Sequence, residues 1–266
     1  MLSVRLLSPE HLWDILSFCP LHADQEHTWE PWDAERYRQG QHRRAGFLAR
    51  KMDQGARLQV AYRDGAAVGF IEYHPIEITN LELVGQDILA IWCMLVRDER
   101  QGIGSALLQA CLDDAQAMGH KGVAVTCRDP VWMPRVLFER FGFVKVSPAG
   151  PNGALLFRSF GDPAGAKSPR WVGRRPEMAP AQGQIVVDVY HTDRCPIHWR
   201  NTALVQEVAH EFGDVVLWRQ HWTDEREDAL YYGTAYGIYI NGEPIVAGLP
   251  VKREHVRRAL REALLA

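Results

Sequence analysis

The chain has 266 residues, of which 47% are hydrophobic, and its formal net charge at pH 7 is −3. A chain of this size buries either one large core or two smaller ones, and we predict two. Charges of both signs are mixed throughout the sequence, without the basic stripe that nucleic-acid binding requires. No apolar run approaches the ~20 residues of a membrane span, and residues 1–6 lack a signal-peptide layout. We therefore expect a cytoplasmic protein that binds neither nucleic acid nor membrane.

The cysteines argue against both a disulfide framework and a structural zinc site. Their number is odd, and no two of them have the C-x-x-C spacing that such sites use. The five are Cys19, Cys93, Cys111, Cys127 and Cys195. We expect reduced thiols and assign no metal ligands.

Residues 1–160 predict a mixed sheet with helices on its faces. The expected strands are 4–7, 57–63, 66–73, 88–96, 122–127, 143–146 and 154–159. One expected helix begins at Ser8-Pro9, and three others cover 33–54, 103–119 and 134–141. Asp64-Gly65 separates two alternating runs and predicts a tight hairpin. The helix over 33–54 is basic on one side, and we expect those charges to face solvent.

The composition changes between residues 161 and 183, where prolines and glycines accumulate. We predict a partly extended linker there. Beyond it, the expected strands are 184–190, 215–220, 237–240 and 244–246, and the expected helices are 196–212 and 252–265. This β-α-β-β-β-α order predicts a second, smaller α/β domain over 184–266.

The stretch from Val96 to Leu108 predicts an anion-binding turn. An apolar strand runs into a charged turn, two glycines and an amphipathic helix. Gly102 and Gly104 allow the backbone to approach a ligand closely. The N–H groups at the start of the helix would then face a phosphate.

Two motifs in residues 1–160 resemble the GNAT superfamily of acyl-CoA-dependent N-acyltransferases. They are the strand leading into Gln101–Leu108, and Leu137–Phe143 after the fifth strand. The resemblance implies an α/β fold, a GNAT mixed sheet flanked by helices, with acetyl-CoA as co-substrate. The turn would hold the pyrophosphate, the strand 93–96 would pair with pantetheine, and an N–H near Leu95 would polarise the thioester carbonyl. The implied cofactor-binding residues are Met94, Leu95, Val96, Gln101, Gly102, Ile103, Gly104, Ser105, Ala106 and Phe138.

This sequence departs from the family's pattern at two positions. Glu99 lies three residues before Gly102, where the usual motif has Gln or Arg; aligned instead on Gln101, the loop is about two residues short. Phe138 lies where many relatives have the tyrosine that protonates the leaving thiolate. That role must then move to another group or to water.

The candidate catalytic residues lie on the strands near the expected thioester. Cys93 is either a proton donor, a transient acyl acceptor or a packing residue. Tyr73 is a candidate replacement for the missing acid, and His74 or Glu77 would take a proton from the amine through water. An ordinary strand end followed by a turn explains the same residues. The segment 24–33, with Trp29 and Trp32, is a candidate lining for the acceptor site.

More narrowly, the sequence resembles a GNAT branch fused to a small thioredoxin-like domain, the YoaP-like proteins. The residues that carry this resemblance are 72–77 (EYHPIE), 91–96 (IWCMLV) and 131–134 (VWMP). Residues 190–198 are similar to a thioredoxin-fold active-site turn, in which the helix start and Arg194 would favour the thiolate of Cys195. His198 replaces the second cysteine, and residues 234–236 (Thr-Ala-Tyr) lie where such folds place a cis-proline. We weigh a single reactive thiol against a degenerate packing or recognition domain, and disfavour a dithiol oxidoreductase.

These patterns together predict an N-acetyltransferase. We expect acetyl transfer from acetyl-CoA to an amine of a small molecule or peptide, by direct attack in a ternary complex. The alternative is a CoA-binding or thiol-sensing two-domain protein without efficient transfer, which the short loop, Phe138 and the lone Cys195 favour. The acceptor and the oligomeric state stay open.

Overall fold

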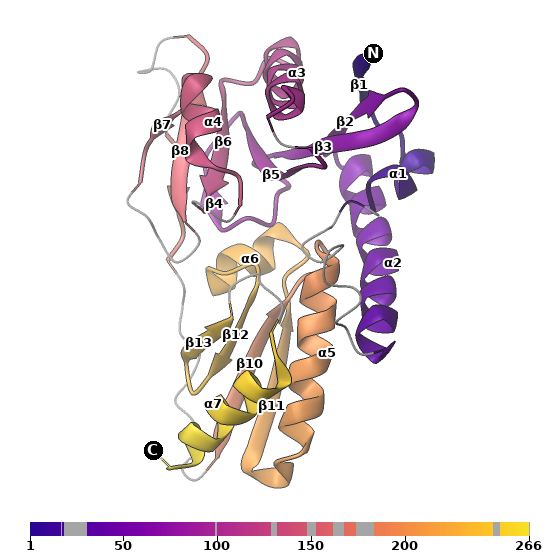
Figure 1. Cartoon of the computed structure of the whole chain (residues 1–266). Coiled ribbons are helices and arrows are strands. Elements are labelled where there is room, and N and C mark those ends of the chain that lie inside the picture. The colour runs from indigo at the N-terminus through magenta and orange to yellow at the C-terminus, as the bar shows by residue number, and fades with distance from the viewer. Residues whose placement is uncertain are drawn as a thin grey trace. The chain divides into compact units, whose positions relative to one another are not determined.

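The structure is a computed structural model that describes residues 1–16, 18, 31–98, 100–128, 132–147, 153–161, 168–173, 184–246 and 251–265. The chain divides into two compact units (Figure 1). The N-terminal unit comprises Met1–Pro20, Leu48–Thr79 and Leu83–Val172, and the C-terminal unit comprises Leu21–Phe47, Asn80–Glu82 and Gly173–Ala266. The units thus cover other residues than the expected domains, because one helix and one loop of the first half contribute to the second unit.

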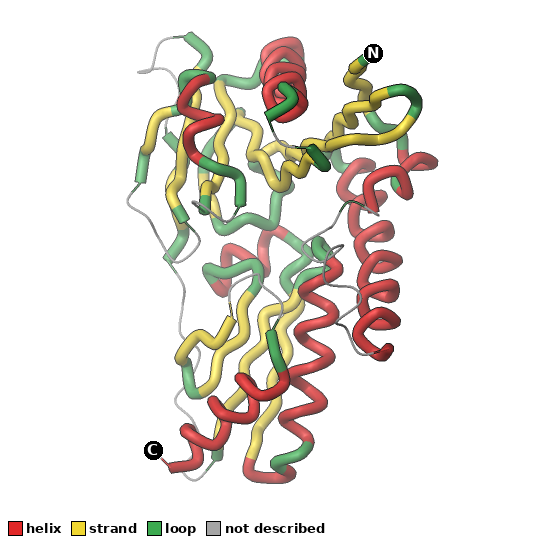
Figure 2. Tube along the Cα trace, in the orientation of Figure 1, coloured by secondary structure: helices red, strands yellow, loops and turns green. Residues whose placement is uncertain are grey.

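The N-terminal unit is built on a seven-stranded sheet of order β1-β2-β3-β5-β6-β8-β7. Its strands are β1 (Leu2–Leu6), β2 (Arg57–Arg63), β3 (Ala66–Pro75), β5 (Ile88–Val96), β6 (Gly122–Cys127), β7 (Val144–Lys145) and β8 (Ala154–Ser159). β5 and β6 are parallel, whereas the other neighbours are antiparallel. The expected mixed sheet is confirmed, and Figure 2 shows its strands in yellow with helices beside them.

The hairpin between β2 and β3 forms as predicted. Asp64 and Gly65 have φ values of 51° and 84°. Positive φ at both central residues is the type I′ geometry, whose twist matches that of the flanking strands.

Helices cover both faces of this sheet. Within this unit they are α1 (Trp13–Leu16), α3 (Ile103–Ala117), α4 (Arg135–Arg140) and the last residues, from Leu48, of α2 (Pro31–Asp53). On one face, Ile103 and Phe138 from α3 and α4 enter a core with Ile71 and Met94 of the sheet. On the other face, the ring of Phe18 meets that of Phe70 edge-on, at 6.0 Å between centroids. The first expected helix is interrupted, with a 3-10 turn (Pro9–His11) before α1.

The basic residues of α2 face solvent only in part: Arg38 and Arg50 are exposed as expected, whereas two others are buried. Arg44 and Lys51 are 2% and 1% exposed. Long cationic side chains can bury their methylene stems while the charged end finds polar partners. Lys51 donates to Oε1 of Gln54 at 3.2 Å. The periodicity of the helix shows that these charges share a side but not what covers it.

Two short strands were missed. β4 (Leu83–Val84) pairs antiparallel with β9 (Arg170–Trp171), so part of the expected linker is ordered against the polar connection after β3. Two-residue strands carry no alternation that a sequence pattern can detect. The linker segments 162–167 and 174–183, Cys19 and the candidate acceptor segment 24–30 lie outside the described residues.

The C-terminal unit has a four-stranded sheet of order β11-β10-β12-β13. Its elements are β10 (Ile185–His191), α5 (Pro196–His210), β11 (Val216–Trp222), α6 (Arg226–Tyr232), β12 (Gly237–Ile240), β13 (Glu243–Val246) and α7 (Arg253–Leu265). β10 is parallel to β11 and antiparallel to β12. Helix α6 was not predicted, because its seven residues are too few to show a helical period. None of the described helices is both long and apolar enough to span a membrane.

Replacing Gly122 by Ala is expected to lower the free energy of unfolding by about 1–3 kcal/mol, as overpacking does. A Cβ at this position would lie 2.5 Å from the carbonyl oxygen of Arg158 and 2.6 Å from the ring of Phe157. Gly173→Ala is the control, since a Cβ there meets no atom within 4 Å. Urea denaturation followed by tryptophan fluorescence compares the two variants, and equal stability would contradict the prediction.

Candidate active site

The central feature of the site is the point where β5 and β6 separate. Their parallel pairing runs from Ile88 opposite Gly122 to Ile91 opposite Val125 and ends there. β5 continues to Val96 while paired with β3, and β6 continues to Cys127 while paired with β8. Among the described residues, the last five of β5 therefore have no strand partner on the β6 side. An extended ligand can hydrogen-bond to such an edge as an added strand would.

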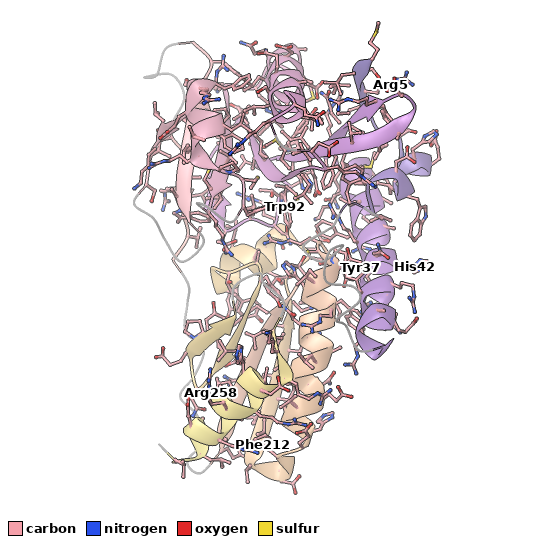
Figure 3. The ribbon with its side chains drawn as sticks, viewed as in Figure 1. Arg5, Tyr37, His42, Trp92, Phe212 and Arg258 are labelled. Carbon is pink, nitrogen blue, oxygen red and sulfur yellow. The ribbon has the colours of Figure 1, made fainter. Side chains whose placement is uncertain are left out.

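A β-bulge lies at the same point of β5. Cys93 is opposite Glu72 while Ile91 is opposite Tyr73, which leaves Trp92 as the extra residue. A bulge bends its strand and redirects side chains. The rings of Trp92, labelled in Figure 3, and His74 stack at 5.8 Å between centroids. Trp92 and Cys93 consequently share the sheet face of Glu72 and His74.

The turn after β5 has the geometry of an anion cradle. Arg100 and Gly102 have φ values of 61° and 77°, and α3 begins at the next residue, Ile103. The N–H of Ala106 donates to the carbonyl of Gly102 at 3.0 Å. The N–H groups of residues 103–105 precede this bond and lie outside the helical ladder. A Cβ at Gly102 would meet no atom within 4 Å, so the backbone is open on that side. The helix dipole favours an anion at this position.

The other implied cofactor residues divide between the open edge and the core. Leu95 and Val96 are partly exposed on β5, and Gln101, Gly102 and Ser105 are exposed at the turn. Gly104 and Ala106 are partly exposed, whereas Met94 and Ile103 are buried in the core on the α3 side. Arg63 hydrogen-bonds to Gln101 and holds the turn against β2.

Phe138 is buried in the core of the N-terminal unit. It is 0% exposed and packs edge-on against Phe143, at 5.5 Å between ring centroids. The expectation that Phe138 contacts the cofactor is therefore corrected, because its ring fills the core between α4 and the sheet.

Tyr73 does not lie with Cys93. Its hydroxyl donates to Oδ2 of Asp114 on α3 at 2.5 Å and accepts from Gln59 at 3.0 Å. Arg57 pairs with the same carboxylate at 2.6 Å. Burial raises the pKa of Tyr73, and nearby Cys111 and Asp114 raise it further. The proposed role of Tyr73 as the acid is corrected, because the hydroxyl is engaged on the opposite face of the sheet.

Glu77 is hydrogen-bonded at the start of β5, away from Cys93. Its Oε1 accepts from the backbone N–H of Asp87 at 2.8 Å, and Asp87 pairs with Lys121 at 2.5 Å. Cys93 follows Asp87 by six residues, which is about 20 Å along an extended strand. The structure thus does not bring Glu77 together with Cys93, and its candidacy as the base is corrected.

His74 is paired with Glu72, which we had not singled out. Nε2 of His74 lies 3.0 Å from Oε1 of Glu72, and both side chains are 0% exposed. Nε1 of Trp92 donates to Oγ1 of Thr79 at 2.8 Å and fixes the indole beside His74. The i, i+2 spacing on a strand was the available signal, since it places two side chains on one face. Cys93 is partly exposed on that face, opposite Glu72.

Thr126 is a second residue that the sequence did not reveal. It follows the last β5–β6 pair on β6, and it is 6% exposed. Its neighbours Val125 and Cys127 face the core under α3, so Thr126 faces the other side, as Cys93 does. Its buried hydroxyl has no hydrogen-bond partner among the described residues.

Cys195 belongs to the C-terminal unit. It is the N-cap residue of α5 and is partly exposed, and its carbonyl accepts from the N–H of His198 at 3.0 Å. The His198 ring stacks on Tyr236 at 3.6 Å between centroids. Burial raises the pKa of Tyr236. The described cysteines, 93, 111, 127 and 195, are all thiols.

Residues 12–143 match the acetyltransferase (GNAT) family model. These residues form a GNAT acetyltransferase domain. The family consists of acyltransferases, so the predicted enzyme class is confirmed. The curated proteins contain no match to this sequence.

Several solved structures are similar to the GNAT part of the chain. The PaiA N-acetyltransferase of Thermoplasma acidophilum with coenzyme A is 12% identical, with a TM-score of 0.46, covering 60% of this chain and 99% of that one. A GNAT acetyltransferase of Brucella melitensis with acetyl-CoA is 17% identical, with a TM-score of 0.41, covering 61% of this chain and 90% of that one. The ribosomal-protein-S18-alanine N-acetyltransferase of Escherichia coli is 15% identical, with a TM-score of 0.41, covering 59% of this chain and 91% of that one. At these scores the likeness carries no further argument.

Tyr73→Phe is expected to make stability less sensitive to alkaline pH. Above about pH 10 the unfolded chain loses the Tyr73 proton while the folded state keeps it, so this group lowers stability by up to about 1.4 kcal/mol per pH unit. The variant loses that contribution, and below pH 9 it is less stable by about 1 kcal/mol, the value of a lost hydrogen bond. Urea denaturation between pH 7 and 11 measures both effects. Parallel wild-type and variant curves would be inconsistent with the buried hydroxyl.

Proposed function

We propose that the GNAT domain transfers the acetyl group of acetyl-CoA to an amine of a small molecule or peptide. The observation that carries this proposal is the separation of β5 from β6 after Ile91, on the strand that leads to the turn at Gly102. An open strand edge and an anion cradle follow one another along the chain. A ligand with an amide-containing arm and a pyrophosphate matches this arrangement.

Acetyl-CoA would bind along the edge of β5. The pyrophosphate accepts hydrogen bonds from the first N–H groups of α3. The pantetheine amides pair with the backbone of residues 93–96, and a backbone N–H near Leu95 polarises the thioester carbonyl. Backbone donors held in place stabilise the negative charge that develops on this oxygen during attack.

The amine approaches from the face that carries Cys93. The opposite face is filled by the core that Ile71, Met94 and Ile103 share. Attack in a ternary complex needs no covalent intermediate, because binding both reactants holds them in reactive geometry. Since Phe138 is packed in the core and the Tyr73 hydroxyl is hydrogen-bonded to Asp114 on the other face of the sheet, Cys93 is our candidate for protonating the departing thiolate.

For the C-terminal unit we propose a thioredoxin-like fold with a single reactive thiol, Cys195. The order β11-β10-β12-β13, with one parallel pair and a helix beginning at Cys195, supports this assignment. His198 lies where a resolving cysteine would be needed, so dithiol exchange is not part of the proposal.

Gly102→Ala is expected to weaken acetyl-CoA binding at least tenfold, or about 1.4 kcal/mol. A methyl group would enter the open side of the cradle, and the positive φ of 77° would strain the turn. Gly142→Ala is a matched control, because its φ is 79° and a Cβ there also meets no atom within 4 Å. Calorimetric titration with acetyl-CoA measures both affinities. Equal weakening in the two variants would remove the cradle from the binding site.

Cys93→Ala is expected to lower kcat for thiol release by about 10- to 100-fold while leaving acetyl-CoA affinity within twofold, since the thiol acts on the departing group. A thiol-release assay over an amine panel measures the rate, and intact-protein mass spectrometry reports any acetylated Cys93. A stable acetyl-Cys93 would favour an acyl-acceptor role, and unchanged turnover would leave a packing role. Tight acetyl-CoA binding by the wild type without release on any amine would favour the CoA-binding or thiol-sensing alternative.

A further inference from the structure

A buried Glu–His pair lies on β3, on the sheet face that carries Cys93 and on the opposite side of β5 from its open edge. Glu72 and His74 are both 0% exposed, with Oε1 and Nε2 3.0 Å apart. Nδ1 of His74, the other ring nitrogen, is buried and has no hydrogen-bond partner among the described residues. Buried polar atoms are normally paired, and an unpaired one destabilises the fold. An orphaned nitrogen here therefore points to a ligand group.

The hydrogen bond to Glu72 determines which nitrogen of the neutral ring carries the proton. A carboxylate only accepts, so neutral His74 donates from Nε2 and leaves a lone pair on Nδ1. This tautomer is assigned from the hydrogen-bond network. The carboxylate also stabilises the imidazolium that forms when Nδ1 gains a proton. The pair therefore has the arrangement of a base held by an orienting acid.

The surroundings fix the ring and provide a second observation. Trp92 stacks on His74 at an interplanar angle of 24°, and Thr79 holds its indole nitrogen. On the other side of β5, the hydroxyl of Thr126 is also buried without a partner among the described residues. Both orphaned atoms belong to the face of Cys93, one on each flank of the strand that would hold the thioester.

We infer that His74 is the catalytic base that takes the proton of the acceptor ammonium, with Glu72 as its positioning residue. This inference rests on the proposed acetyl transfer. It commits the substrate to an amine that arrives protonated, and it places the accepting lone pair on Nδ1. Thr126 is inferred to hydrogen-bond the bound acceptor.

The proton and electron balance is as follows. Nδ1 takes one proton from the ammonium, and the freed lone pair of the amine forms the C–N bond to the thioester carbon. Collapse of the tetrahedral intermediate breaks the C–S bond. The departing thiolate takes the second amine proton, by way of Cys93 or water, to give the free thiol of CoA. His74 then releases its proton to solvent.

The kinetic experiment compares Glu72→Gln and His74→Gln with Glu77→Gln. Glu77 is an exposed glutamate that caps a loop, so its variant controls for loss of a carboxylate from the same chain segment. The expected result is a fall in kcat of about 100-fold or more in the first two variants, typical of a lost general base, with acetyl-CoA Kd within twofold. The double variant should be no slower than His74→Gln, because the pair acts as a unit. Glu77→Gln should keep wild-type kcat.

A spectroscopic measurement tests the same pair without depending on catalytic activity. In protein labelled with ¹⁵N-histidine, the His74 ring, assigned by its loss in His74→Gln, should carry its proton on Nε2 in the wild type. Glu72→Gln should weaken that preference. A proton on Nδ1, or kcat within twofold of wild type in folded His74→Gln, overturns this inference and leaves the proposed function standing. Absence of amine acetylation by the wild type overturns the proposed function and this inference with it, whereas loss of kcat that tracks loss of thermal stability overturns the catalytic role of the pair.

Discussion

The loss of the β6 partner after Ile91 is the constraint on which the N-terminal unit's site depends. Parallel strands that stay paired would satisfy each other's backbone groups and leave nothing for a ligand. Here β5 keeps its pairing with β3 and gives up that with β6, so one row of backbone groups becomes available. The bulge at Trp92 lies at the same step and bends the strand there. The turn at Gly102 then follows within the same chain segment, so both binding elements are positioned by one strand.

The two faces of the sheet have separate tasks. The α3 side holds the apolar core and the partly buried Tyr73–Asp114–Arg57 network, which ties the helix to β2 and β3. The other side carries Glu72, His74 and Cys93. This division explains why a tyrosine and a histidine that are adjacent in sequence have different environments, since successive strand residues point to opposite faces.

How far the sequence predicts the site can be judged from particular residues. The turn was found because glycine at positive φ and a helix start have local signals. Tyr73 and Glu77 were interpreted wrongly, because the position of a side chain at a strand end depends on which partner it meets. Glu72 was not singled out, since its importance arises from His74 and Cys93 on either side of it. Arg44 and Lys51 of α2 are buried against the expectation, because the helical period does not show what covers each side of the helix.

The sequence by itself determined the elements whose cause is local: the Asp64-Gly65 hairpin, the apolar strand β5, the glycine turn and the amphipathic helix after it. Backbone conformation and periodicity act over a few residues, so they can be read without a fold. The tertiary structure alone decided where β5 leaves β6, which face each polar residue of β3 occupies, and that residues 83–84 pair with 170–171. These outcomes depend on strand register between segments distant in the chain, where a shift of one residue would reverse every side chain.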